Sequence, residues 1–400
     1  MTERHPLPIR FGADRLAADP SLAGTARRVG LVTNDAARLA ADPAARARLA
    51  LHRAGVPIVR LFGPEHGLGA NAADGAPVDD STDALTGLPV VSLYGERMRP
   101  AAADLAGLDA VLFDVPDVGA RFYTYAWTLL EVGTACAEHG VPLVVLDRPN
   151  PLGGSMAAVE GPLLDPAYRS FIGGDTIPVR HSLTLGELAL LWRGERWGGA
   201  DVRVVACDGW ERRMLWPDTG LDWVPTSPAM PGVESVLLYP GTCLFEATNL
   251  SVGRGSDSPF RIVGAPWLDA ARVLDHLSRR TPRGARFERQ EFTPQAGPYA
   301  GESCEGVAIV VTDAAVTRPV ATGLLLLASV IATHRLRFSW ARYPTAANPR
   351  GDGHFERLIG RSGIRSRLDA APDLVDGPLV ESWTRAEGWE ERVKDALLYR

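Results

Sequence analysis

Lysine is almost absent from this sequence: among 400 residues the only one is Lys394, close to the C-terminal end. Enzymes that form a lysine Schiff base, pyridoxal-phosphate enzymes and P-loop NTPases all need a lysine inside the active site. A single lysine at the end of the chain does not meet that need. The sequence therefore argues against all three classes.

Cysteine is also scarce, and the spacing of the cysteines does not indicate a metal site. The four cysteines are widely separated and form no CxxC pair: Cys136, Cys207, Cys243 and Cys304. Zinc sites and disulfide scaffolds both depend on closely spaced cysteines, and no HxxxH pair of histidines replaces them. We therefore expect reduced, mostly buried thiols, with no metal and no cofactor.

An excess of positive charge is missing as well. The net charge is −6, whereas proteins that bind nucleic acid or an anionic membrane usually carry a basic stripe. The N-terminal segment has no apolar core of the kind found in signal peptides, so the sequence predicts a cytoplasmic protein. The most apolar tract, Gly323–Ala332, is too short to span a bilayer and reads as a buried helix. A small-molecule substrate is the expected partner, and the oligomeric state cannot be read.

The sequence lacks one motif typical of dinucleotide-binding proteins and one motif typical of serine hydrolases. The first predicted strand, Arg28–Asn34, is followed by Asp35 and two alanines, without the glycine that a pyrophosphate requires. This argues against a nicotinamide- or flavin-dependent oxidoreductase. The GxSxG elbow of α/β serine hydrolases is missing too.

Continuous apolar runs alternate with helical segments through the first half of the chain. This pattern is typical of a parallel sheet covered on both faces, so we predict an α/β fold with a Rossmann-like parallel sheet in residues 1–230 and a smaller mixed α/β domain in residues 231–400. A helix is expected over Ala36–Ala54, closed by Gly55. Further strands are expected at Val56–Phe62, Pro89–Leu93, Asp109–Asp114, Pro142–Leu146, Asp201–Cys207 and Gly306–Val311.

Polar side chains follow four of these strands. In parallel sheets the carboxyl ends of the strands meet at one edge, where ligands bind. The sequence therefore predicts a site at this edge that draws on Asn34, Glu65, His66, Asp114, Asp117, Asp147, Arg148 and Asn150.

Among these strand ends, the stretch Leu61–Val78 gives the clearest indication of a site. The strand must stop at Pro64, which places Glu65 at its tip before a loop containing Gly67, Gly69 and Gly75. A carboxylate presented to a ligand and an ordinary connection with a surface glutamate both fit this stretch.

Other candidates carry less weight. Gly253 and Gly255 flank Arg254 in a turn that could bind an anion, although such turns are usually solvated surface. His181 is a lone histidine, and these are more often structural than catalytic. For Tyr123, which is close to Arg121 in the chain, the sequence favours packing in the core or in the wall of a site over catalysis. Three loop tryptophans either stack on sugar or pin the loops by burial: Trp210, Trp216 and Trp223.

Several blocks together carry a family resemblance. They occur in order as GPEHGLGANAADGAPV, TGLPVVSLYGERMRP, FDVPDVGARFYTY, VLDRPNPLGG, VEGPLLDPAYRSFIG, IPVRHSLTLGELA, YPGTCLFEATNLSVGRGSDSPF and GAPW. In these blocks the chain resembles the exo-β-N-acetylmuramidase family, long known as a domain of unknown function. Two departures are the missing signal peptide and the turn TNDAA, where relatives tend to have TNPTG.

The resemblance implies a cleft between two domains that releases N-acetylmuramic acid from the non-reducing end of peptidoglycan fragments, without metal or nucleotide. It places the catalytic glutamate on Glu65, with His66 beside it, and makes Glu246 the second acid in the block that ends at Asn249. Glycosidases commonly use two such carboxyl groups. Substrate-assisted catalysis, with Asp114 or Asp117 steadying the sugar amide, is equally compatible.

The implied substrate is a muropeptide or the disaccharide of N-acetylmuramic acid and N-acetylglucosamine, handled in cell-wall recycling. Its lactyl carboxylate needs a cation, for which Arg121, Arg148 and Arg254 are the candidates. A non-catalytic protein that binds muropeptides remains the alternative.

Overall fold

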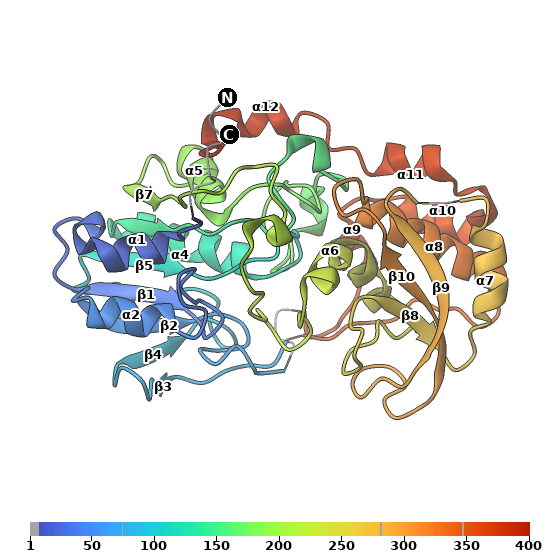
Figure 1. The fold of residues 1–400 in the computed structure, drawn as a ribbon, viewed down its shortest axis with the longest axis horizontal. Helices are drawn as coiled ribbons and strands as arrows, with labels where there is room; N and C mark the ends of the chain where they lie inside the picture. The colour runs from blue at the N-terminus through green and yellow to red at the C-terminus, as the bar shows by residue number, and fades with distance from the viewer. Residues whose placement is uncertain (1–7, 74, 281, 346–347) are drawn as a thin grey trace.

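The computed structural model describes residues 8–73, 75–280, 282–345 and 348–400. The chain forms two lobes that lie side by side, with the N-terminal half on the left of Figure 1 and most of the C-terminal half on the right. Each lobe contains its own sheet.

The N-terminal lobe is built on a seven-stranded sheet in the order β3-β4-β2-β1-β5-β6-β7. Every neighbouring pair is parallel except β3 with β4, which is antiparallel. Without the short β3, this is the Rossmann strand order, whose ligand crevice lies beyond the carboxyl ends of the two central strands, here β1 and β5. The strands are β1 (Val29–Thr33), β2 (Ile58–Gly63), β3 (Ser81–Thr82), β4 (Pro89–Ser92), β5 (Ala110–Asp114), β6 (Leu143–Leu146) and β7 (Val202–Val205).

Alternate strand residues bury opposite faces of this sheet. Leu31 and Leu112 belong to one apolar core, which they share with helices α1 and α2. Val32 and Phe113 belong to the other, shared with α4 and α5. Because both faces are covered, the central strands β1, β5 and β6 are buried at every position, as expected of a parallel sheet covered on both faces. The helices of this lobe are α1 (Gly12–Ala18), α2 (Ala47–Arg53), α3 (Ala102–Leu105), α4 (Tyr125–His139) and α5 (Leu185–Glu195).

The helix predicted over Ala36–Ala54 is wrong in its first half, because only α2 forms and Ala36–Arg46 is an irregular loop. Asp14 of α1 explains the difference. Its carboxylate accepts hydrogen bonds from the backbone N–H groups of Ala40 and Ala41, at 3.0 and 3.2 Å. These bonds hold the loop against α1. Gly55 does end α2, with φ of 85°.

The C-terminal lobe packs helices on a three-stranded antiparallel sheet in the order β8-β10-β9. Helices α6 and α8 approach closely because both have glycine at the contact: a Cβ on Gly241 would lie 1.8 Å from the carbonyl oxygen of Pro319. The elements are α6 (Val233–Thr242), β8 (Ile262–Ala265), α7 (Ala270–Leu277), β9 (Ala285–Phe292), β10 (Cys304–Val311), α8 (Pro319–Thr333), α9 (His354–Ile359), α10 (Ile364–Ala370), α11 (Gly377–Trp383) and α12 (Trp389–Val393).

Short 3-10 helices occupy several connections in both lobes. They are η1 (Pro20–Ala23), η2 (Met156–Ala158), η3 (Pro166–Tyr168), η4 (Trp216–Thr219), η5 (Cys243–Ala247), η6 (Pro372–Leu374) and η7 (Lys394–Ala396).

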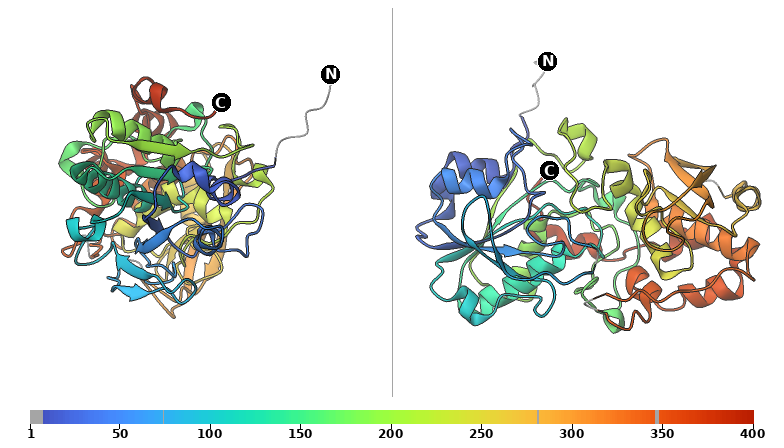
Figure 2. Two further views of the ribbon diagram at one scale, coloured as in Figure 1. Left: turned by 90° about the vertical axis from the view of Figure 1, so that its left-hand side faces the viewer. Right: turned by 90° about the horizontal axis from the view of Figure 1, so that it is seen from below.

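The C-terminal segment, coloured red, returns to the N-terminal lobe, where α12 lies close to the C-terminal end of the chain (Figures 1 and 2). The indole N–H of Trp389 donates to the carbonyl of His181 at 3.0 Å. The hydroxyl of Tyr399 donates to the carboxylate of Asp147 at 2.6 Å. The chain therefore crosses between the lobes twice.

Two expectations about apolar segments and thiols can be compared with the fold. The tract Gly323–Ala332 lies in α8 and is almost wholly buried, as predicted. Within the described ranges, no helix combines the length and the hydropathy needed to cross a membrane. All four cysteines are buried free thiols, which confirms that prediction.

Candidate active site

Glu65 lies just beyond the end of β2, in a tightly turned loop. The N–H of Gly67 donates to the carbonyl of Pro64 at 2.9 Å, and both His66 and Gly67 have left-handed backbone conformations, with φ of 66° and 70°. A non-glycine residue seldom adopts this conformation, so the loop is held in an unusual shape. As a result, Glu65 turns inward and is only 6% exposed.

Two donors fix the carboxyl group of Glu65, one from the loop that follows it and one from the residue before α4. The backbone N–H of Gly75 donates to Oε1 at 3.0 Å, and the hydroxyl of Thr124 donates to Oε2 at 2.5 Å. Thr124 directly precedes α4, so that helix sets the position of the hydroxyl. The carboxyl group is therefore oriented before any substrate arrives, as catalytic groups generally need to be.

His66 is oriented by its own loop. Its Nδ1 atom lies 2.9 Å from the carbonyl oxygen of Ala72, and the residue is 5% exposed. A carbonyl can only accept, so Nδ1 carries the proton and, in the neutral ring, Nε2 is the acceptor. The histidine thus presents a defined tautomer next to Glu65.

Glu246 comes from η5 in the C-terminal lobe. Its Oε1 accepts from Nε of Arg254 at 2.6 Å, and its Oε2 lies 3.3 Å from the Sγ of Cys243. The Glu246 and Arg254 side chains are only 7% and 18% exposed. A partly buried carboxylate and guanidinium are thus held together on this wall.

Glu65 and Glu246 line the same pocket, although 180 residues separate them in the chain. The pocket has a cavity volume of about 60 Å³. Six of its other lining residues are tyrosine or phenylalanine, and Tyr343 stacks on His354 with ring centroids 4.7 Å apart. The remaining lining residues are His66, Gly75, Tyr94, Phe122, Tyr123, Thr124, Phe171, Ile172, Tyr239, Cys243, Arg254, Tyr343, Thr345, His354 and Leu358.

Five predicted site residues therefore meet in this pocket: Glu65, His66, Tyr123, Glu246 and Arg254. The other predicted residues do not line it. Most of them serve the surrounding framework, and their partners show how.

Asp114 and Arg148 pair with each other beneath the sheet edge. The guanidinium donates to both carboxylate oxygens, at 2.7 and 3.1 Å, and the side chains are 0% and 8% exposed. Burial raises the pKa of Asp114, whereas Arg148 lowers it. Asp117 lines a different cavity.

Arg121 is fully buried and donates to three backbone carbonyls, those of Pro162, Ile177 and Leu358. Burial lowers the pKa of this guanidinium to about 9. Its donors hold together segments from both lobes and do not face the pocket. In this position Arg121 is a structural cation.

The remaining predicted residues also bond to the framework. Burial lowers the pKa of His181 to about 3, so this histidine is neutral near pH 7. Asp147 accepts from the hydroxyls of Thr184 and Tyr399 and from the N–H of Gly186. Each of the three asparagines donates one hydrogen bond from Nδ2 and accepts one backbone N–H at Oδ1. The acceptors are the Tyr125 hydroxyl for Asn34 and the carbonyls of Leu183 and Arg337 for Asn150 and Asn249. The N–H donors are Ala36, Leu152 and Ser339, in the same order.

Sequence reasoning missed several lining residues. Thr124 lies inside the block FDVPDVGARFYTY, one residue beyond the candidate Tyr123, so the motif was a usable signal. Tyr343 and His354 come from a segment without a motif or periodic pattern, and only the fold brings them to the pocket.

Comparisons with known proteins show the family to which the chain belongs. The family model described as exo-beta-N-acetylmuramidase NamZ, N-terminal, matches residues 29–234, and the corresponding C-terminal model matches residues 237–399. The peptidoglycan beta-N-acetylmuramidase NamZ of Bacillus subtilis (strain 168) is 38% identical over 392 residues, which cover 98% of this chain and 91% of that protein.

Two solved structures of DUF1343 family proteins from Bacteroides fragilis NCTC 9343 have a similar fold. They are 28% and 27% identical to this chain, with TM-scores of 0.85 and 0.75. In both cases the match covers 98% of this chain and 99% of the other. As its sequence motifs predicted, the chain belongs to the exo-β-N-acetylmuramidase NamZ family, which consists of glycoside hydrolases.

Proposed function

We propose that this protein is an exo-acting glycoside hydrolase that releases N-acetylmuramic acid from the non-reducing end of peptidoglycan fragments. The observation that carries the proposal is the meeting of Glu65 and Glu246 in one pocket from two different lobes. Glycosidases flank the scissile bond with two carboxyl groups in this way. The B. subtilis relative, a peptidoglycan beta-N-acetylmuramidase, supports the substrate class.

In this mechanism Glu65 protonates the leaving oxygen and later acts as general base. Gly75 and Thr124 hold its carboxyl group in position for that transfer. Glu246 acts as the second carboxyl group or orients the sugar, and His66 lies beside Glu65 with its Nδ1 atom held by the carbonyl of Ala72. For a substrate-assisted route, Asp114 is poorly placed to steady the amide because Arg148 engages both of its oxygens.

The pocket must widen to admit substrate. Its volume of about 60 Å³ is below the roughly 150 Å³ of a cavity that accommodates one six-membered ring. Because the acids lie on separate lobes, we propose that substrate enters when the walls move apart and that the acids approach the bond on closure.

Incubation with the disaccharide of N-acetylmuramic acid and N-acetylglucosamine tests this function directly. We expect chromatography to show the two free sugars. A protein that only binds muropeptides would return the disaccharide intact, and that outcome would refute the proposal.

Cell-wall recycling in the cytoplasm belongs to the same proposal. Four buried free thiols fit a reducing compartment, where disulfides are rare. The finding of the protein in the exported fraction of its native cells would contradict this location.

Arg254 is proposed to bind the lactyl carboxylate of the substrate, because it is the arginine that lines the pocket among the described residues. We expect Arg254→Gln to weaken inhibition by N-acetylmuramic acid about 10- to 100-fold, the scale of a charge-assisted hydrogen bond. Inhibition by N-acetylglucosamine, which lacks the lactyl group, should change much less. An equal loss for both sugars would mean that Arg254 acts only through Glu246. Arg261→Gln, at a surface pair with Glu234, is the matched control.

A further inference from the structure

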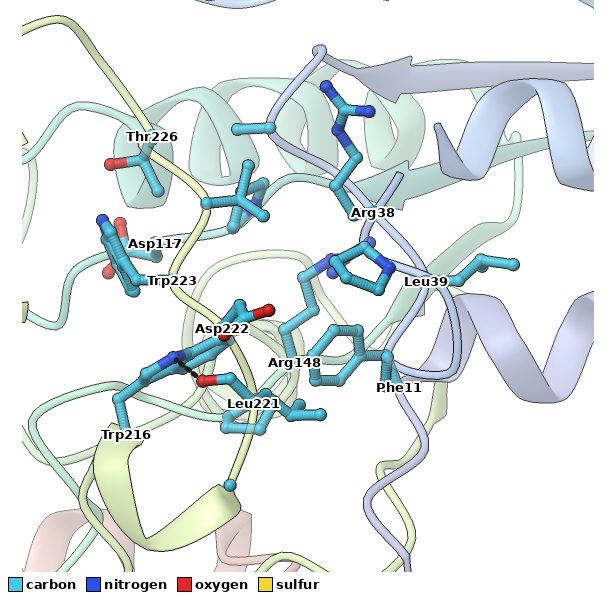
Figure 3. Close-up of a pocket in the computed structure, with 17 residues that line it drawn as sticks. Phe11, Arg38, Leu39, Asp117, Arg148, Trp216, Leu221, Asp222, Trp223 and Thr226 are labelled. Atoms are coloured by element: carbon cyan, nitrogen blue, oxygen red, sulfur yellow. Dashed lines mark hydrogen bonds between the residues drawn. The ribbon is translucent and has the colours of Figure 1, made fainter. Parts of the chain in front are cut away.

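A second cavity lies at the carboxyl edge of the parallel sheet, next to the ends of β1, β5 and β6. Its walls come from the loop after β1, from Asp117 after β5, from Arg148 after β6 and from the strap that contains Trp216 and Trp223 (Figure 3). The cavity volume is about 160 Å³. In sheets with this strand order, ligands bind in this crevice.

A buried wall separates this cavity from the pocket of Glu65. The hydroxyl of Tyr123, which lines the acid pocket, donates to Oγ1 of Thr226 at 2.7 Å. Thr226 lines the second cavity, and its carbonyl accepts from the hydroxyl of Tyr125 at 3.0 Å. The two spaces are therefore neighbours with separate linings.

Fixed aromatic rings form one side of the second cavity. The indole N–H of Trp216 donates to the carbonyl of Leu221 at 3.0 Å, and that of Trp223 donates to the carbonyl of Met230 at 2.9 Å. The two rings lie edge to face with centroids 5.2 Å apart. Because their polar atoms are satisfied, the rings offer apolar surface to a ligand, and the volume matches one six-membered ring.

Asp117 supplies a polar group that lacks a partner. Its Oδ2 accepts from the N–H of Gly119 at 2.7 Å, whereas its Oδ1 is buried and has no hydrogen-bond partner among the described residues. Burial raises the pKa of this carboxyl group to about 7. Buried carboxylate oxygens are normally hydrogen-bonded, so a ligand that donates a hydrogen bond would complete the site.

Arg148 places a positively charged guanidinium in the lining of the same cavity. Its Nε and Nη2 atoms donate to Asp114, and its guanidinium lies over the ring of Phe11, 4.8 Å from the centroid. Within the described part of the chain, its Nη1 atom makes no hydrogen bond, and it is available to an anion.

We propose that this cavity is a second saccharide site, which takes one pyranose bearing a carboxylate. The sugar ring lies against Trp216 and Trp223, a hydroxyl or amide N–H of the sugar donates to Asp117, and its carboxylate accepts from Arg148. N-acetylmuramic acid has this chemistry. The proposal concerns binding alone and does not require hydrolysis at Glu65.

Calorimetric titration of the intact protein with N-acetylmuramic acid tests the proposal. Trp223→Ala and the isosteric Asp117→Asn should each weaken one binding event at least about 10-fold, the scale of losing a stacking contact or a charge-assisted hydrogen bond. N-acetylglucosamine should bind this site at least about 10-fold more weakly than N-acetylmuramic acid, because it has no carboxylate for Arg148.

Trp267→Ala is the matched control, since Trp267 is a partly buried tryptophan of the C-terminal lobe whose N–H donates to Tyr299. It should leave every binding event unchanged. Equal affinity and stoichiometry in the unaltered protein, Trp223→Ala and Asp117→Asn would overturn the second site. If the protein left muramides intact but kept a Trp223-dependent event, only the hydrolase proposal would fail.

Discussion

Glu65→Gln is expected to lower the turnover of a chromogenic β-N-acetylmuramide at least about a hundredfold, the usual scale for removal of a general acid. The amide keeps the size of the side chain and can still bond to Gly75 and Thr124, which hold the carboxyl group. It cannot donate the proton that the leaving group needs. Steady-state rates and the thermal unfolding midpoint, measured on the same preparation, should show lost turnover in a folded protein.

A neutral control for this change is Glu138→Gln. Glu138 pairs with Arg99 at the surface, and its side chain is 49% exposed. Its turnover should match that of the unaltered protein. Full activity in Glu65→Gln would remove Glu65 from the mechanism and leave the shared pocket without its proposed acid.

The sequence predicted the position of Glu65 just beyond the end of β2, because local chemistry determines that position. Pro64 ends an apolar strand, and Gly67 allows the tight loop that follows. The rest of the site depends on tertiary contacts. Tyr343 and His354 reach the pocket from beyond α8, and no periodicity in the chain marks them.

The strand-end rule located polar residues without assigning their roles. It placed Asp114 and Arg148 at the correct edge of the sheet, but it could not show that they bond to each other. The loop Ala36–Arg46 was predicted as a helix because its alanine-rich spacing fits one, whereas Asp14 holds it in another conformation. That loop now forms part of the second cavity.

Arg148→Met should lower the free energy of unfolding by about 3–5 kcal/mol, because it leaves the fully buried Asp114 without its cation. Urea denaturation at pH 7 measures the loss. Arg97→Met is the matched control. Arg97 pairs with Asp80 at the surface, where the side chains are 37% and 54% exposed, so its removal should cost no more than about 1 kcal/mol.

The pH dependence distinguishes an unpaired charge from lost packing in Arg148→Met. Burial already raises the pKa of Asp114, and loss of Arg148 removes the group that opposes this shift. The folded variant then holds a proton that the unfolded chain releases above about pH 4, so its free energy of unfolding should fall as the pH rises. Asp114→Leu combined with Arg148→Met should recover most of the stability and abolish this slope. A loss that stayed constant with pH would instead identify packing of the arginine side chain as its main contribution.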